Sequence, residues 1–418
     1  MKIIIVGGGL MGVTSAWYLL QDGHEVIVLD KHNSVGRETS FANGGQISVG
    51  QAEPWANPAA PAKLIRWLGK NDAPLLFRPC LDTKQWSWAV KFLMECLPNR
   101  TYKNTKQCLV LANYSRNKLR ALRESTDIKY DDLQKGILTV HTDEKEFDLA
   151  RERVDMFKNY GVEIQVKNLQ EIFKLEPALK SSEVPIIGGT YAPEDESGDA
   201  FSFTQKLADL AQKQGAVFGF GVQALRLLSE GNNITGLETK VGERKEKLTA
   251  DAYVIASGCN SRFLMKSIGV DIPVYPVKGY SVTVPLANPD AAPHVCITDE
   301  NAKIAISRLG GRIRAAGTAE LSGYDLNVRE ERCIAIINRL KRHFPEIGGF
   351  ENVSRWAGLR PAVPNNLPLI GKTKLSNLFI NTGQGTLGWT LACGSAAGLA
   401  NVIGGQTQEI DYPFLDNC

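Results

Sequence analysis

The feature that most constrains this chain is a glycine pattern at its start. Residues 2–6, KIIIV, form a short β-branched run, and Gly7, Gly9 and Gly12 follow it in the spacing G-x-G-x-x-G. A helical segment then leads to a second strand at residues 24–30. A buried strand, a glycine turn, a helix and a second strand within about 30 residues predict a βαβ unit that binds a dinucleotide.

Each part of this pattern has a physical role in holding a diphosphate. Gly7 permits a tight turn, Gly9 lets the backbone approach the pyrophosphate, and Gly12 lets the helix pack closely on the strand. The helix N-terminus directs free N–H groups and a partial positive charge at the phosphates. Asp30 ends the second strand, and its carboxylate is expected to accept hydrogen bonds from ribose hydroxyls. Lys31, which follows it, is expected to be a further cofactor contact. The unit by itself leaves FAD and NAD open.

Three later segments favour flavin over nicotinamide. A nicotinamide enzyme would continue with further βα units, but residues 38–48, ETSFANGGQIS, form a Gly-Gly loop with hydroxyl and amide side chains. A strand near residue 255 ends in A-S-G, and residues 378–389 give a strand, a glycine loop and the start of a helix. The N-terminus of that helix suits the electron-rich N1–C2=O side of a flavin. The cofactor contacts expected from these segments are Ser40, Asn43, Gly44, Gly45, Gln46, Ala256, Gly258, Gly383, Gly385, Thr386, Leu387 and Gly388.

With these segments the chain resembles the D-amino acid oxidase superfamily of FAD enzymes, and within it the small catalytic subunit of bacterial D-amino acid dehydrogenases. The resemblance covers nearly the whole chain and rests on GGGLMG, ETSFANGGQIS, PVKGY, WAGLRP and NTGQGTLGWTLACGS. It departs at Gln384, where related dehydrogenases carry His.

The resemblance implies an α/β fold with two interleaved domains. One is a Rossmann-like FAD-binding domain over residues 1–50, 145–271 and 355–418. The other is a substrate domain, built on an antiparallel sheet with helices, over residues 51–144 and 272–354.

The resemblance also implies an activity. Family members oxidise a D-amino acid, such as D-alanine or D-proline, by hydride transfer from Cα to flavin N5, which requires no catalytic side chain. The products are a 2-oxo acid and ammonia, and a quinone-type acceptor takes the electrons. Arg360, in the G-L-R-P segment, would bind the substrate carboxylate, and Val222 would lay its backbone amide against adenine. Tyr280 is a candidate wall of the substrate pocket.

The residues leave several alternatives open. No His or Cys lies where a covalent flavin link would be expected, so the prediction is non-covalent FAD. The same chemistry would serve an oxidase of D-amino acids, glycine or sarcosine that uses O2, or a dehydrogenase of D-hydroxyproline. A flavin-bearing electron-transfer subunit without its own substrate is a further alternative, and the intact Arg360 counts against it.

Composition excludes other classes of protein. The 48 Lys+Arg and 45 Asp+Glu give a net charge of +3 over 418 residues, which is no electrostatic footprint for nucleic acid. Eight cysteines without a CxxC pair and five scattered histidines predict neither a metal site nor a disulfide framework. We therefore expect reduced thiols in a cytoplasmic protein.

Three stretches bear on membranes. Residues 3–21 and 375–408 carry almost no charge, but their scattered glycines and polar groups indicate buried core. Residues 55–98 hold four of the seven tryptophans, and WSWAVKFLMECL at residues 86–97 has the composition of an interfacial helix. This segment predicts either peripheral attachment to the inner face of the cell membrane or a helix packed in the substrate domain.

Overall fold

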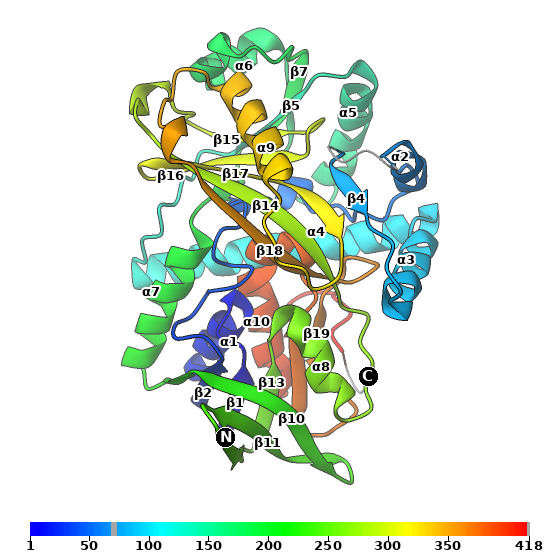
Figure 1. Ribbon diagram of the computed structural model, residues 1–418, viewed down its shortest axis with the longest axis vertical. Coiled ribbons are helices and arrows are strands. Elements are labelled where there is room, and N and C mark those ends of the chain that lie inside the picture. Colours follow the sequence, from blue (N-terminus) through cyan, green and yellow to red (C-terminus); the bar gives the residue numbers. More distant parts are fainter. Residues whose placement is uncertain (68–72, 416–418) are drawn as a thin grey trace.

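The computed structural model describes residues 1–67 and 73–415, and two large sheets organise them (Figure 1). The first sheet has the order β19-β20-β13-β1-β2-β9. Five of these strands run parallel, and β19 pairs antiparallel with β20. The bounds are β1 Lys2–Val6, β2 Glu25–Asp30, β9 Val217–Phe220, β13 Ala252–Ile255, β19 Leu369–Lys372 and β20 Leu378–Thr382.

Both faces of this sheet are covered, which explains why β1 is apolar at successive positions. Ile3 and Ile5 face helices α1 (Leu10–Gln21) and α10 (Gly388–Gly404), while Ile4 and Val6 face the opposite side. That side is covered by helix α8 (Ser261–Lys266) and a small sheet of β10 (Val222–Glu230), β11 (Asn233–Val241) and β12 (Arg244–Leu248). A strand buried on both faces has no polar alternation.

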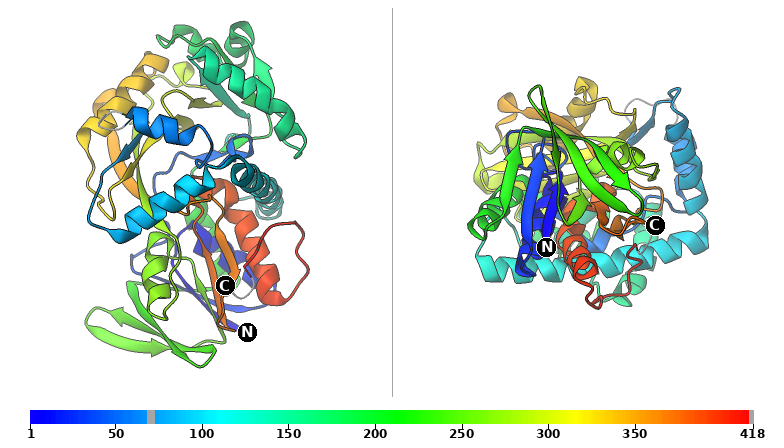
Figure 2. Two further views of the ribbon diagram at one scale, coloured as in Figure 1. Left: turned by 90° about the vertical axis from the view of Figure 1, so that its right-hand side faces the viewer. Right: turned by 90° about the horizontal axis from the view of Figure 1, so that it is seen from below.

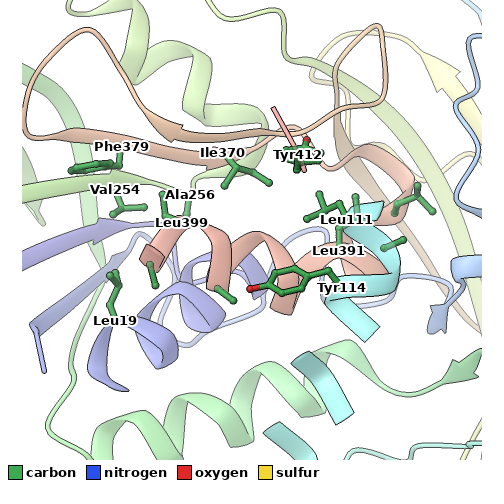
Figure 3. Close-up of a cluster of buried hydrophobic side chains, with 14 of the residues drawn as sticks. Leu19, Leu111, Tyr114, Val254, Ala256, Ile370, Phe379, Leu391, Leu399 and Tyr412 are labelled. Carbon is green, nitrogen blue, oxygen red and sulfur yellow. The ribbon is translucent and has the colours of Figure 1, made fainter. Parts of the chain in front are cut away.

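Helix α10 is the centre of the larger core cluster. It packs between α1 and α4 (Pro98–Thr126), and Figure 3 shows Leu391 and Leu399 of α10 among side chains from α4 and the sheet. A Cβ on Gly394 would lie 2.7 Å from the Cβ of Ser115, so only glycine allows this approach of α10 to α4. Within the described residues one segment, Gly385–Gly404, is long and apolar enough to cross a membrane, and 78% of its window is buried. The expectation of buried core for residues 375–408 thus agrees with its packing.

The second sheet has the order β18-β14-β17-β16-β15-β5-β7-β6, with β4 paired to β17. It is mostly antiparallel, and helix α9 (Glu330–His343) packs on its β14–β17 face. The strands are β4 Leu75–Phe77, β5 Ile137–His141, β6 Gln165–Lys167, β7 Gly188–Ala192, β14 Tyr275–Pro285, β15 Cys296–Asp299, β16 Ile304–Leu309, β17 Arg312–Leu321 and β18 Ser354–Ala362.

The strand pairings differ from the domain boundaries expected from the sequence. β18 pairs with β14 in the second sheet, although residues 355–418 are expected in the FAD-binding domain. β6 and β7 also lie in the second sheet rather than with the rest of residues 145–271. Helix α4, expected in the substrate domain, packs on α10 instead. Pairing between distant segments decides this membership, and local motifs do not encode it.

The remaining helices and short strands lie around the two sheets (Figure 2). The short strands β3 (Gln46–Ile47) and β8 (Glu196–Ser197) pair with each other. The small sheet β10–β12 projects at the end of the molecule opposite the second sheet. The other helices are α2 Ala60–Trp67, α3 Thr83–Glu95, α5 Glu144–Lys158, α6 Leu169–Leu175 and α7 Ala200–Lys213.

Candidate cofactor and substrate site

A cavity of about 410 Å³ opens beyond the carboxyl ends of β1, β2 and β13. This is the edge at which open parallel sheets bind their ligands. Three stretches that are far apart in the sequence meet there, within residues 6–43, 222–264 and 361–389. The predicted contacts that line the cavity are Gly7, Gly9, Asp30, Lys31, Ser40, Asn43, Val222, Ala256, Gly258, Gly385 and Gly388.

The geometry at Gly7 and Gly12 agrees with the tight turn and the close helix packing predicted for them, and Gly9 has open space beside it. Gly7 has φ +114°, and a Cβ there would lie 2.6 Å from the carbonyl oxygen of Ala256. A Cβ on Gly12 would lie 1.8 Å from the carbonyl oxygen of Gly7, so Gly12 serves helix packing and does not line the cavity. Gly9 has open space beside it, because a Cβ there would meet nothing within 4 Å. The turn therefore leaves room for a ligand at Gly9.

The N-terminus of α1 is open toward the cavity. Its N-cap residue is Gly9, which has no side chain to cap the first-turn amides. The Leu10 N–H donates to Oγ of Ser40 at 3.2 Å, which fixes the loop against the helix. Such a helix end supplies N–H donors and a partial positive charge. The residues present thus fit the pyrophosphate of FAD.

Asp30 lines the cavity and also shapes the turns beside it. Its Oδ2 accepts from the Gly8 N–H at 2.7 Å, and its Oδ1 accepts from the His32 N–H at 2.8 Å. Each carboxylate oxygen has a further lone pair, so ribose hydroxyls can still donate to Asp30. Lys31 pairs with Glu38 at 2.5 Å between Nζ and Oε1. Burial opposes ionisation of Glu38, but hydrogen bonds from Lys31 and His32 hold the pKa of this carboxyl below its usual range.

The other predicted contacts do not line the cavity but lie in the segments that form it. Gln46 donates from Nε2 to Oγ1 of Thr298 at 2.9 Å, so the Gly-Gly loop rests on the second sheet. Gly45 and Gly383 have φ +72° and +89°, conformations that glycine adopts without strain. The predicted contacts that do not line the cavity are Gly12, Gly44, Gly45, Gln46, Gly383, Thr386 and Leu387.

Sequence reasoning missed a further set of lining residues. Most of them flank predicted contacts, so a wider reading of each motif would have included them. Asn260, Phe263 and Leu264 carry no local signal, because the fold alone brings α8 and the turn before it to the cavity. The full set is Val6, Leu10, Met11, Leu29, His32, Arg37, Glu38, Thr39, Gln223, Ala224, Leu225, Ser257, Asn260, Phe263, Leu264, Pro361, Gln384 and Trp389.

Arg360 lies on β18, one residue before the cavity-lining Pro361. Its Nη1 donates to the carbonyl oxygen of Thr318 at 3.0 Å, and no acidic side chain among the described residues pairs with it. A Cβ on Gly279 would lie 2.1 Å from Nη1, so the guanidinium lies directly over this glycine. Burial lowers the pKa of Arg360 to about 10, and the group stays charged at neutral pH.

Tyr280 does not lie on the Arg360 face of the sheet. Arg360 pairs with Val277 and Gly358 with Gly279, so Arg360 shares a face with the odd-numbered residues of β14. Tyr280 points to the opposite face, where it belongs to the core cluster that includes α9. Its hydroxyl donates to Oε2 of Glu320 at 2.8 Å. This corrects the expectation of a pocket wall, because a shift of one residue along a strand reverses the face.

Comparisons with known proteins agree with this geometry. The family model for FAD dependent oxidoreductases matches residues 2–402. The chain is 46% identical to the D-amino acid dehydrogenase of Dechloromonas aromatica (strain RCB) over 99% of this chain and 100% of that protein. It is 45% identical to the D-amino acid dehydrogenase of Paramagnetospirillum magneticum (strain ATCC 700264 / AMB-1), over 99% and 98%. The fold resembles the crystal structure of glycine oxidase from Geobacillus kaustophilus, with a TM-score of 0.76 at 22% identity, over 98% and 96% of the two chains. The predicted fold class is confirmed.

Replacing Asp30 by Ala should weaken FAD binding, because it removes the acceptor for the ribose hydroxyls and for the Gly8 and His32 N–H groups of the neighbouring turns. Loss of charge-assisted hydrogen bonds costs roughly 1.5–3 kcal/mol, so the affinity should fall by about one to two decades. Titration of the apoprotein with FAD, followed by flavin fluorescence, measures this. Asp22→Ala, at the exposed other end of α1, is the matched control and should bind FAD normally. An unchanged affinity for Asp30→Ala would assign Asp30 to loop structure alone.

Proposed function

This chain belongs to the family of FAD dependent oxidoreductases, and we propose that it is a dehydrogenase of D-amino acids. The names of the two relatives described above support this substrate class. The observation that carries the proposal is the charge of Arg360, which pairs with no acidic side chain among the described residues and lies one residue before the cavity-lining Pro361.

Arg360 suits a ligand carboxylate for an energetic reason. A guanidinium that is partly withdrawn from solvent and has no anion beside it is destabilised, and its hydrogen bond to Thr318 uses one N–H of Nη1. A carboxylate would neutralise the charge and accept two parallel hydrogen bonds from the fork. Because Arg360 is only partly buried, its remaining donors are available to such a ligand. An α-amino acid supplies this carboxylate.

The position of Arg360 also orients the substrate. The Thr318 carbonyl holds the guanidinium from one side, and the bare Gly279 lets it lie flat on the sheet. A carboxylate held at two points has one orientation, which determines which face of Cα turns toward the cavity. FAD, when bound, supplies the acceptor for the hydride that leaves Cα. Loss of that hydride and of one proton from the nitrogen gives an imino acid, and water converts it to a 2-oxo acid and ammonia.

We further propose that a quinone takes the electrons at a membrane surface. The outer face of α3 exposes Trp86, Val90 and Leu93, with exposed fractions of 49%, 57% and 49%. Leu97, just beyond the helix, is also exposed. Exposed Lys91 flanks this apolar face and would favour anionic headgroups. The name dehydrogenase given to the relatives is in keeping with an acceptor other than oxygen.

The proposed activity is tested by adding D-alanine or D-proline to the purified protein without oxygen. The oxidised flavin absorption should bleach, and acid precipitation should release the flavin into the supernatant because FAD is not covalently bound. A protein that retains its absorption with every D-amino acid would contradict the proposed substrate class. Rapid reoxidation by air would instead identify an oxidase.

Replacing Arg360 should remove substrate binding but not FAD. Arg360→Ala should cost at least about 3 kcal/mol in kcat/KM, as for truncation of a buried charge pair. Arg360→Lys keeps the charge but loses the fork, so it should raise KM and lower kcat together. Steady-state reduction of an acceptor dye measures both constants. Arg355→Ala, on the same strand and exposed, serves as the control. A kcat/KM within threefold of wild type for Arg360→Ala would show that Arg360 is not the anchor.

Replacing Gly279 by Ala should act through Arg360 alone. The new Cβ would lie where the guanidinium is, 2.1 Å from Nη1, and would displace it. A displacement on the order of 1 Å should lower kcat/KM by roughly 10²-fold, while FAD content stays normal. Gly311 lies in the turn between β16 and β17, and a Cβ there would meet nothing within 4 Å, so Gly311→Ala should leave the kinetics unchanged. Equal kinetic constants for Gly279→Ala and Gly311→Ala would show that the substrate carboxylate does not bind Arg360.

Membrane attachment is tested by flotation with vesicles that contain anionic lipid. Trp88 and Phe92 are buried at 7% exposure each, so the informative variant replaces Trp86, Val90 and Leu93 by Ser. Wild type should float and this variant should stay at the bottom of the gradient. A control variant removes the exposed apolar side chains of Leu326, Val328 and Ile334 and should float like wild type. Flotation by the α3 variant would contradict the proposal that the outer face of α3 binds the membrane.

A further inference from the structure

A buried hydrogen-bond acceptor in the cavity wall has no partner in the described part of the chain. Gln384 lines the cavity and is 4% exposed. Its Oε1 is buried and accepts no hydrogen bond from any of the described residues. Leaving such a group unpaired is costly, so its presence in a ligand cavity points to a donor on the ligand.

The orientation of this amide is fixed by a chain of three hydrogen bonds. The Ser15 hydroxyl donates to the carbonyl oxygen of Met11 at 2.7 Å, so its oxygen is free to accept. Asn381 donates from Nδ2 to that oxygen at 3.0 Å, which leaves the Asn381 Oδ1 as an acceptor. Gln384 donates from Nε2 to this Oδ1 at 2.6 Å. Rotation of the Gln384 amide by 180° would set two acceptor oxygens against each other.

The other residues of this hydrogen-bond chain cannot rotate to offer Gln384 Oε1 a donor. Ser15 and Asn381 are fully buried, in α1 and in β20. Gln384 is held by its own backbone as well, because its carbonyl oxygen accepts from the Leu387 N–H at 3.1 Å and it forms a β-bridge with Ala362. Gln384 Oε1 is therefore presented to the ligand as an acceptor only.

The position of Gln384 indicates which part of FAD it meets. The βαβ unit holds the adenosine end of the dinucleotide at Asp30 and Val222. Gln384 lies instead between β18, which carries Arg360, and the start of α10. The flavin ring belongs at this end, beside the substrate. The oxidised ring presents acceptors at N1, O2, O4 and N5, and N3–H is its only N–H donor.

We propose that Oε1 of Gln384 accepts a hydrogen bond from N3–H of the flavin ring and so sets the ring's rotation in the cavity. This inference deepens the proposed function and rests on FAD being the cofactor, whichever amine is oxidised. A substrate ammonium is the other N–H donor that reaches this end of the cavity, and the experiment separates the two.

The test compares FAD with N3-methyl-FAD, which lacks the donor, on apoprotein. Affinity is measured by flavin fluorescence. Wild type should bind FAD about tenfold more tightly than the methylated analogue. Gln384→Met keeps the length of the side chain but removes the acceptor, so it should bind FAD about tenfold more weakly and lose the preference between the two flavins. The coupling between the two changes is the readout, and it requires no catalysis.

Gln408→Met is the matched control. Its Oε1 is also buried and unpaired within the described residues, but Gln408 does not line the cavity. This variant should keep the full preference for FAD over the methylated analogue. It separates an effect of the flavin donor from a general effect of removing a glutamine amide close to either end of α10.

Three results would overturn the proposal. Equal binding of both flavins by wild type would do so without any substitution, so the test holds even where Gln384→Met is unstable. A preference that persists in Gln384→Met would show that N3–H is paired elsewhere. A persistent preference together with a raised KM for D-alanine would assign Oε1 to the substrate ammonium instead. Failure of every D-amino acid to bleach the flavin would contradict the proposed function and leave this comparison unaffected.

Discussion

The contact between Gly12 and the carbonyl oxygen of Gly7 determines where the rest of the site lies. With no side chain at Gly12, α1 packs against the turn that leaves β1, and its N-terminus comes to the carboxyl edge of the sheet. Ser40, Asp30 and the start of α10 are then arranged around that helix end. A side chain at Gly12 would push α1 away and separate these groups. One missing Cβ thus places the cofactor end of the cavity.

How far the sequence predicts the molecule depends on how local each feature is. The βαβ unit is contained in about 30 residues, so its turn, its helix end and Asp30 were all predicted in their observed places. The Arg360 segment was found by resemblance, and its position beside the cavity agrees with that prediction. The domain boundaries could not be derived in the same way, because β18 joins the second sheet by pairing with β14.

Tyr280 shows the same limit at the level of one residue. Tyr280 lies on β14, the strand that pairs with the Arg360 strand β18. The face of the sheet to which its side chain points depends on the register between these two strands. That register is set by the whole sheet and its packing against α9. A motif contains the residue but not its face. Tyr280 therefore does not line the cavity, although it belongs to a motif. Conversely, Asn260 and Phe263 belong to no motif and do line it.

The two faces of the second sheet differ in whether their buried charges are paired. On the α9 face, Glu320 is fully buried and accepts from Tyr280 and from Arg78, and buried Lys278 pairs with Asp325 at 2.9 Å. These charges satisfy one another and hold β14 and β17 together. The register between these strands shifts between Lys278 and Tyr280.

The irregularity at this shift links the closed network to the open site. Thr318 lies within it, has φ +59°, and its carbonyl oxygen accepts from Arg360 on the other face. β-bulges of this kind redirect groups next to functional sites. The ionic network fixes the strands on one face, the bulge turns a carbonyl toward the other, and Arg360 is held there with its charge uncompensated. An arginine that only stabilised the sheet would be paired like Lys278, and the absence of an acidic partner for Arg360 among the described residues is the ground for proposing that a substrate carboxylate binds it.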